Sequence, residues 1–364
     1  MRQTRRNLLL ITLSLVCLGI VMVYSSSALY GYHHYKDAMF YLKRHLLYAC
    51  IGIALAAFVM AMDYAKLRAF SKPILFLSIV LLLCVYIPGL GVQVGGAKRW
   101  IRIGNFTIQP SEFVKLAIII YLADFLSRKK HVIKSFVQGF LPPSLIVGAT
   151  LALVLAQPDL GKTVSIAVVA FLLYAVAGIN FAHMVSVFLF SLPLVYSLVY
   201  QVAYRRKRIL AFLNPWQDPR GAGYQIIQSY IALGSGGLLG VGLGASRQKL
   251  FYLPQSHTDF IFSIIGEELG LVGASAVIIL FFLFVTEGMR ISARARDLFG
   301  QLLGVGITST ICMEALINIG ASIGAIPTKG LPLPFVSYGG SAIIANLIGV
   351  GLLLNIAKNR RVNV

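Results

Sequence analysis

The chain is poor in acidic residues and in charge altogether. Only 12 of its 364 residues are Asp or Glu, and 12% of the chain is charged, whereas 58% is hydrophobic. A soluble domain carries about twice that share of charge, so this composition excludes an ordinary soluble protein. The mean hydropathy of +0.82 points instead to an integral membrane protein.

Cysteine is scarce as well. Cys17, Cys50, Cys84 and Cys312 lie singly inside apolar runs, and no two of them form a Cys-x-x-Cys pair. This spacing argues against a disulfide framework and against a cysteine metal site. We expect the four side chains to be small buried hydrophobic groups. No metal site and no cofactor are predicted, and a requirement for a divalent cation is left open.

Because acids are few, the formal net charge reaches +20. With the N-terminus placed inside, half of the 32 basic residues fall in short inner segments, where the positive-inside rule puts them. Nucleic acid is therefore not the expected partner. Both termini are predicted to be cytoplasmic.

The apolar runs are about 17–24 residues long, which suits helices that cross a hydrocarbon core about 30 Å thick. The runs are continuous rather than alternating, which favours helices over a closed barrel. A secretory signal is the alternative for the first run, but the stretch from Leu8 to Val23 is long for one. We expect an all-α protein, a single membrane domain over residues 1–364, with about ten spans near 8–29, 45–62, 73–90, 111–126, 140–156, 162–179, 184–203, 262–288, 299–321 and 341–357.

One connection is long: residues 204–261, between the seventh and eighth spans, on the extracytoplasmic side by the same charge count. Connections of this length are uncommon and often functional. Within it, "IIQSYIALGSGGLLGVGLG" predicts a half-apolar helix that runs into a glycine-rich turn along the membrane interface. The remaining basic residues lie on this side or at the edges of spans, and many of them cluster. They are either simply solvated or bind an anionic ligand such as a lipid pyrophosphate.

Two outer motifs place charges at the start of a span. In "QPSEFVKL", Glu112 and Lys115 are three residues apart on one helix face, in or near the outer leaflet. Ionisable groups there are costly and are functional candidates, with a structural salt bridge as the alternative. In "QPDLGK", Asp159 stands three residues before Lys162 and allows the same two interpretations, or capping of the next helix.

The stretch "LPQSHTDFIF", 253–262, sets Asp259 just before a long apolar run, at headgroup height if the helix continues without a break. Shielding by Phe260 and Phe262 would raise the pKa of the Asp259 carboxyl, as a general base requires. The alternative is an aspartate that accepts the free N–H groups at the helix start. These residues alone leave both interpretations open.

The stretch "IPTKGLPLPFVSYGGS", 326–341, is a loop rich in proline and glycine that enters the last span. It adds Lys329 to the outer cations. The hydroxyl of Ser337 is placed either to donate to a phosphate or to cap the helix.

Five motifs, in the same order along the chain, resemble the SEDS family of bacterial cell-wall polymerases. They are "GAKRWI…QPSEFVKLA", "QPDLGK", "NPWQDPRGAGYQIIQSYIALGSGGLLGVGLG", "LPQSHTDFIFSIIGEELG" and "GLPLPFVSYGGS". Within that family, "GASRQKLFYLP" and "IPTKGLPLPF" are more similar to the division protein FtsW than to the elongation protein RodA.

The resemblance implies a ten-helix inverting glycosyltransferase of the bacterial cytoplasmic (inner) membrane, working at the division septum. Its substrate would be lipid II, a disaccharide pentapeptide on undecaprenyl pyrophosphate, which it joins into β-1,4-linked peptidoglycan outside the membrane. The implied partners are lipid II, a class B penicillin-binding transpeptidase and other divisome membrane proteins.

The resemblance also assigns residues. The essential acid of the family's H-T-D-F motif falls on Asp259, and its substrate cavity falls on Trp100, Arg102, Glu112 and Lys115, while Asp159 matches the Q-P-D motif. We also expect His257, Thr258, Lys329 and Ser337 to bind substrate. One departure is Gln255, where many relatives carry Glu.

Other functions stay open at this point. A lipid II flippase needs a polar path through the bilayer centre, and the best clue for one is Glu314, in the middle of the ninth span. A scaffold that only recruits a transpeptidase, or an elongation-type polymerase like RodA, is also compatible with the motifs.

Overall fold

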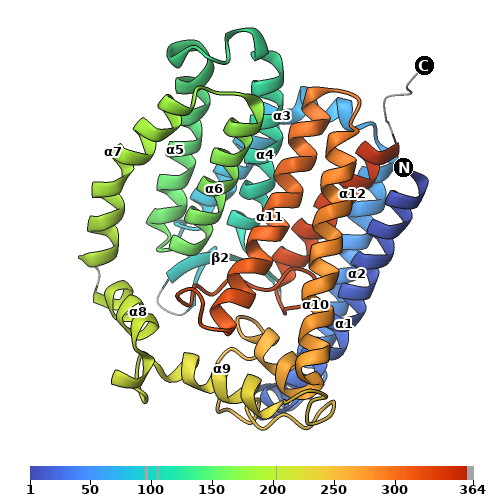
Figure 1. Cartoon of the computed structure of the whole chain (residues 1–364), viewed down its shortest axis with the longest axis vertical. Coiled ribbons are helices and arrows are strands. Elements are labelled where there is room, and N and C mark those ends of the chain that lie inside the picture. Colours follow the sequence, from blue (N-terminus) through green and yellow to red (C-terminus); the bar gives the residue numbers. More distant parts are fainter. Residues whose placement is uncertain (95–96, 105, 202, 359–364) are drawn as a thin grey trace.

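The computed structural model describes residues 1–94, 97–104, 106–201 and 203–358. Ten long helices form a bundle (Figure 1). Each coincides with one predicted span, so the prediction of a helical membrane protein is confirmed, with ten helices at the predicted places. They are α1 (Arg2–Tyr35), α2 (Phe40–Ala61), α3 (Tyr64–Cys84), α4 (Pro110–Arg128), α5 (Leu141–Ala156), α6 (Leu160–Ala177), α7 (Phe181–Tyr200), α10 (Ile261–Ala293), α11 (Leu298–Ser322) and α12 (Gly340–Lys358).

Among the described residues, eight helices are long and apolar enough to cross a membrane by themselves. Two of the ten helices, α4 and α7, are not among these eight. Helix α4, at the centre of the bundle, carries Glu112, Lys115 and Asp124, all buried, and the apolar part of α7 is shorter, Phe181–Pro193. Helices α11 and α12 are the most enclosed of the eight. The core of the protein therefore lies where α4, α11 and α12 meet.

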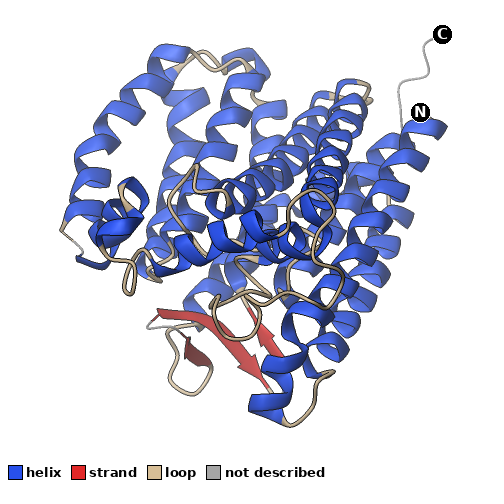
Figure 2. Cartoon of the chain, turned by 60° about the horizontal axis from the view of Figure 1, so that its bottom comes forward, coloured by secondary structure: helices blue, strands red, loops and turns tan. Residues whose placement is uncertain are grey.

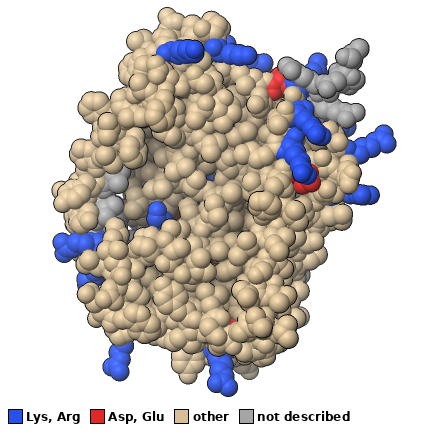
Figure 3. Space-filling model, in the orientation of Figure 1, with Lys and Arg blue, Asp and Glu red and all other residues tan. Residues whose placement is uncertain are grey.

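The N-terminus and the C-terminal end of α12 lie at the same end of the bundle (Figure 1). Lys and Arg gather at the two ends of the molecule and leave most of the surface between them uncharged (Figure 3). An apolar belt between charged ends is the pattern expected of an integral membrane protein.

The opposite end of the bundle carries structure that the sequence prediction missed. A three-stranded antiparallel sheet, of order β1-β2-β3, contains β1 (Gly91–Val94), β2 (Ala97–Ile103) and β3 (Phe106–Ile108). Its strands are seen at the lower left of Figure 2. Strands of four, seven and three residues are too short to show a period among charged neighbours. The all-α membrane fold class holds for the chain, and this small sheet is an addition that the sequence pattern did not indicate.

The long connection contains two helices, α8 (Ala203–Leu213) and α9 (Tyr224–Ser235), with a short 3₁₀ turn at Pro215–Gln217 between them. Helix α9 runs across the end of the bundle rather than along it (Figure 1). It then enters a chain of tight turns that use glycines at positive φ, such as Gly237 and Gly240.

Helix α10 is broken near its start, at Gly270, where φ is 68° and ψ is −165°. The glycine turn after α9 hydrogen-bonds into the break: the N–H of Leu271 donates to the carbonyl of Gly237 at 2.9 Å. A β-carbon on Gly270 would lie 2.3 Å from the nitrogen of Gly240, so glycine is required here. The continuous helix assumed in placing Asp259 is therefore wrong.

The four cysteines correct another expectation. Cys17 and Cys50 are exposed on the outside of the bundle, and Cys84 and Cys312 are partly exposed, with no disulfide in the described part of the chain. In a membrane protein an apolar side chain need not be buried within the protein, because lipid is an equally suitable environment.

Candidate functional site

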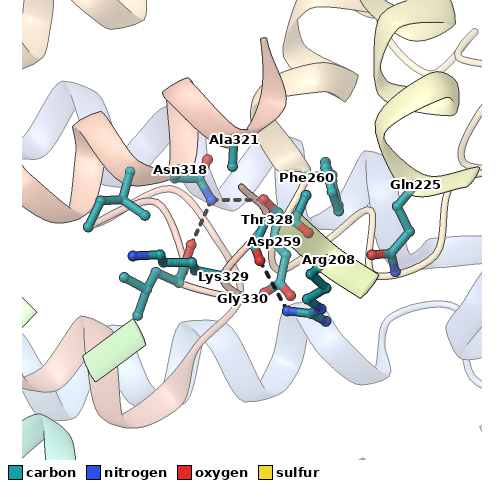
Figure 4. Close-up of a pocket in the computed structure, with 11 residues that line it drawn as sticks. Arg208, Gln225, Asp259, Phe260, Asn318, Ala321, Thr328, Lys329 and Gly330 are labelled. Carbon is teal, nitrogen blue, oxygen red and sulfur yellow. Dashed lines mark hydrogen bonds between the residues drawn. The ribbon is translucent and has the colours of Figure 1, made fainter. Parts of the chain in front are cut away.

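A small pocket, with a cavity volume of about 10 Å³, lies at the C-terminal end of α11, and Asp259 forms part of its wall (Figure 4). Four elements contribute side chains to it. Arg208 comes from α8, Gln225 from α9, Asn318 from α11 and Lys329 from the loop between α11 and α12. The long connection and the last loop thus meet at this pocket.

Asp259 is held by a tight turn two residues before α10. The carbonyl of Gln255 accepts from the N–H groups of Thr258 and Asp259, at 3.2 and 3.1 Å. The N-cap residue, directly before α10, is Phe260, and no side chain caps the helix. The capping role considered for Asp259 is therefore not what the structure shows.

The electrostatic setting of Asp259 suits proton transfer. Burial raises the pKa of its carboxyl to about 6, because a low-dielectric site disfavours the charge. Arg208, Arg99 and Lys162 act in the opposite direction without cancelling the effect of burial. A carboxylate with a pKa near neutrality can accept a proton from a reacting hydroxyl and release it afterwards.

The cation Lys329 faces the same pocket. Burial lowers the pKa of its amine. Among the described residues, no side chain forms an ion pair or hydrogen bond with that amine. A cation held without an internal partner is available to a ligand, and an anion would restore its charge balance.

Glu112 and Lys115 lie elsewhere, in a buried cluster of four charges. Lys115 binds Glu112 at 3.0 Å and Glu314 at 2.5 Å, while Lys162 pairs with Glu112 and lies 3.4 Å from Glu314. All four side chains are at most 2% exposed. We call this set, Glu112, Lys115, Lys162 and Glu314, the buried quartet.

The buried quartet joins α4, α6 and α11, and its two positive and two negative charges balance. Paired charges are tolerable inside a membrane bundle, whereas a lone one is not. Glu314, the strongest sequence clue for transport, is therefore already neutralised by two lysines. The structural salt bridge considered for Glu112 and Lys115 is present.

Asp159 is 5% exposed and caps α6, accepting from the N–H of Lys162 at 3.2 Å. Arg99 reaches the same turn from β2, donating to the carbonyl of Gln157 at 3.1 Å. The helix cap that the sequence suggested is present, and the sheet is tied to the start of α6.

Trp100 and Arg102 both lie on β2, where Arg102 pairs with Thr107 of β3. The side chain of Arg102 is exposed and that of Trp100 is partly buried. Neither lines the pocket around Asp259, so the structure does not bring them together with the predicted base.

His257, Thr258 and Ser337 connect the two loops beside the pocket. The hydroxyl of Ser337 donates to the carbonyl of Thr258 at 2.6 Å and accepts from the N–H of Leu333 at 2.8 Å. His257 is buried among the rings of Tyr30, Tyr41 and Tyr338, and burial lowers its pKa to about 4. These groups hold the loops in place.

Some residues of the site were not predicted. Asn318 belongs to no motif that we singled out, and Gln225 lies within a family motif but was given no role. Arg208 was not singled out, Lys162 was noted only as the neighbour of Asp159, and Glu314 was considered only as a clue for transport. In the described part of the chain, no three His, Cys, Asp or Glu side chains gather as metal ligands would.

A family model described as "Cell cycle protein", for FtsW, RodA and SpoVE, matches residues 5–362. The chain belongs to this family. The predicted resemblance is therefore confirmed over nearly the whole length.

Individual relatives agree. The probable peptidoglycan glycosyltransferase FtsW of Geobacter metallireducens is 44% identical over 354 residues, 97% of this chain and 94% of the relative. Stage V sporulation protein E of Bacillus subtilis is 46% identical over 362 residues, 99% of both chains.

Solved structures share the fold. A chain from "Structural coordination of polymerization and crosslinking by a peptidoglycan synthase complex" superposes with a TM-score of 0.80 at 29% identity, covering 97% of each chain. The rod shape determining protein RodA of Thermus thermophilus gives a TM-score of 0.72 at 25% identity, covering 98% of this chain and 97% of RodA.

Proposed function

We propose that this protein is a peptidoglycan glycosyltransferase that polymerises lipid II into β-1,4-linked glycan at the outer face of the cytoplasmic membrane. The FtsW relatives bear the name of this activity. The main structural support for this activity is one pocket. In it, Asp259, with a pKa of about 6, lies beside Arg208 and Lys329.

In the proposed reaction, Asp259 takes the proton from the 4-hydroxyl of the acceptor sugar. The hydroxyl oxygen attacks the anomeric carbon of the donor, and the bond from that carbon to the pyrophosphate breaks. The electron pair leaves with undecaprenyl pyrophosphate, and the α-linked donor becomes a β-linked product. Lys329 and Arg208 stabilise the charge that develops on the leaving group.

The other predicted residues take two kinds of role. Arg102 and Trp100, on the sheet, are proposed to contact the lipid II headgroup away from the reacting atoms. Lys115 and Glu112 are fully buried, and we propose that they act by holding α4 against α6 and α11. His257, Thr258 and Ser337 shape the loop that carries the base, and Asp159 fixes the start of α6.

Transport is a weaker candidate. Its main clue, Glu314, is ion-paired with Lys115 and Lys162 inside the bundle. A flippase would need this charge, or another one, to face a polar path.

The test is polymerisation of lipid II by the purified protein with its cognate transpeptidase, whose own active site is blocked. Glycan polymer from the wild type supports the proposal. Absence of polymer from folded, partner-bound protein would contradict it, and a lipid-flipping assay with a Glu314→Gln control would then decide on transport.

A class B penicillin-binding transpeptidase and other divisome membrane proteins are the proposed partners, with the septum as the place of action. The similar chain from a peptidoglycan synthase complex that couples polymerization and crosslinking supports such a partnership. A fluorescent fusion should gather at mid-cell and co-purify with the transpeptidase. Labelling along the side wall would favour an elongation role instead.

A further inference from the structure

Asn318 lies one turn before the end of α11 and is 1% exposed. Its Nδ2 donates two hydrogen bonds, one to the main-chain carbonyl of Asp259 at 2.9 Å and one to that of Leu331 at 2.8 Å. Figure 4 shows both bonds leaving the same nitrogen. One side chain thus joins the loop that carries the proposed base to the loop that carries Lys329.

The orientation of this amide is fixed by its surroundings. Turning it over would set Oδ1 against two carbonyl oxygens and lose both bonds. Oδ1 itself is buried and accepts no hydrogen bond from the described part of the chain. The two donors of the amide group are therefore the property that this position uses.

The loop bound by Asn318 lies close to the base. A β-carbon on Gly330 would come within 3.1 Å of Oδ2 of Asp259. On the other side of the loop, Arg208 donates to the carbonyl of Thr328 at 3.1 Å. Lys329 stands between these two anchors. Its distance from Asp259 therefore depends on the bridge that Asn318 makes.

We propose that Asn318 is a positioning residue for glycosyl transfer, which fixes the base Asp259 relative to the cation Lys329 by bridging residues 259 and 331. The hydrogen bonds of the Asn318 side chain go to main-chain carbonyls, so Asn318 acts through these two residues. The inference rests on the function proposed above and adds to it a residue outside the predicted motifs.

Loss of the bridge has two expected effects. Small displacements of reacting groups reduce turnover strongly, about a hundredfold for a shift of roughly 1 Å. A loosened loop also admits water to Asp259, so the pKa that burial had raised falls. Arg208 of α8, Arg99 of β2 and Lys162 of α6 still favour the ionised form of Asp259, and Lys329 of the last loop lines the same pocket.

The experiment compares Asn318→Ala and Asn318→Ser with the wild type, and measures lipid II polymerisation per folded protein from about pH 5 to 8. We expect kcat of the Ala variant to fall about tenfold to a hundredfold, with KM for lipid II changed less than about twofold. The acidic midpoint of its rate profile should move to lower pH. The Ser variant keeps one hydrogen-bond donor, so its kcat and its acidic midpoint should lie between those of the wild type and of Asn318→Ala.

Asn355 of α12 provides a matched control, because its Nδ2 also bridges main-chain carbonyls. They are those of Val59 at 2.7 Å, of Met60 at 3.4 Å and of Met62. These acceptors lie at the other end of the bundle. Asn355→Ala should keep the wild-type kcat and acidic midpoint per folded molecule.

The inference would be overturned if the acidic midpoint of the rate profile were unchanged in the Asn318 variants. It would also be overturned if Asn355→Ala lost as much kcat as Asn318→Ala, because Asn318 would then have only a structural role. If Asn318→Ala does not fold, the Ser variant decides by the same criteria. If the Asn318 variants polymerise lipid II normally while Asp259→Asn is inactive, the inference is wrong but the proposed function is supported. A wild type that makes no polymer would contradict both the inference and the proposed function.

Discussion

The carboxylate of Asp259 lies beside Gly330, where φ is +65° and where a β-carbon would come within 3.1 Å of Oδ2 of Asp259. The two residues come from loops 71 positions apart, and their contact closes one side of the pocket. Glycine is needed for two reasons. It tolerates the left-handed conformation, and it leaves room for the carboxylate.

We predict that Gly330→Ala lowers polymerisation much more than stability. The backbone strain costs about 1 kcal/mol, whereas the new methyl group displaces the proposed base. Gly178→Ala is the control, because residue 178 has φ +86° but nothing within 4 Å of a β-carbon. The Gly178 variant should show the same small loss of thermal stability with normal activity per folded molecule. Equal activities of the two variants would contradict the role given to this contact.

Asp259 should also make stability depend on pH. Its folded pKa, about 6, lies above its usual value of 3.8, so the native state holds the proton more tightly than the unfolded chain does. Stability contributed by this group is present below about pH 4 and is lost as the pH rises through about 6. Asp259→Asn should therefore raise the melting temperature at pH 7.5 and leave it nearly unchanged at pH 4.

At neutral pH, Asp259→Asn should raise the free energy of unfolding by at most about 3 kcal/mol, and by less where solvent reaches the carboxylate. Thermal unfolding in detergent at the two pH values measures it. A variant that is no more stable than the wild type at pH 7.5 would show that the carboxyl is not destabilised by burial.

The sequence predicted the ten helices because apolar runs of membrane-spanning length are the strongest pattern a chain can carry. It also marked Asp259 and Lys329 through their motifs. It could not show that Asp259 and Gly330 touch, since two loops far apart in sequence meet there. Lys162 and Glu314 gave no sign that they would join Lys115 and Glu112. The role of Asn318 could not be predicted from the sequence, because a single asparagine in an apolar helix forms no recognisable pattern.

The buried quartet should be sensitive to imbalance of charge. Lys115→Met leaves two carboxylates against one lysine, and we expect a loss of about 3–5 kcal/mol in the free energy of unfolding. The double variant Glu112→Gln/Lys115→Met restores balance around the remaining Lys162–Glu314 pair and should recover part of that loss. Lys43→Met, in a pair with Asp37 whose lysine is 64% exposed, should cost less than about 1 kcal/mol.

Unfolding monitored in detergent for these three variants tests the balance. Should the double variant be less stable than Lys115→Met, the quartet would not be held together by its net neutrality.

Ser337 distinguishes a structural role from substrate binding. Its hydroxyl already donates to Thr258 and accepts from Leu333. We therefore predict that Ser337→Ala loses about 1–3 kcal/mol of stability and some kcat, with KM for lipid II unchanged. Steady-state kinetics and thermal unfolding give both quantities. A large rise in KM at normal stability would instead support the binding role that the sequence suggested.

The central claim is that Asp259 is the general base of glycan polymerisation. It is tested most directly by lipid II polymerisation with the wild type and with Asp259→Asn, each bound to the blocked transpeptidase and checked for folding. We predict polymer from the wild type only, with a wild-type rate that rises with pH through a midpoint near the pKa of about 6. Polymer formed at the normal rate by a folded Asp259→Asn variant would contradict the account.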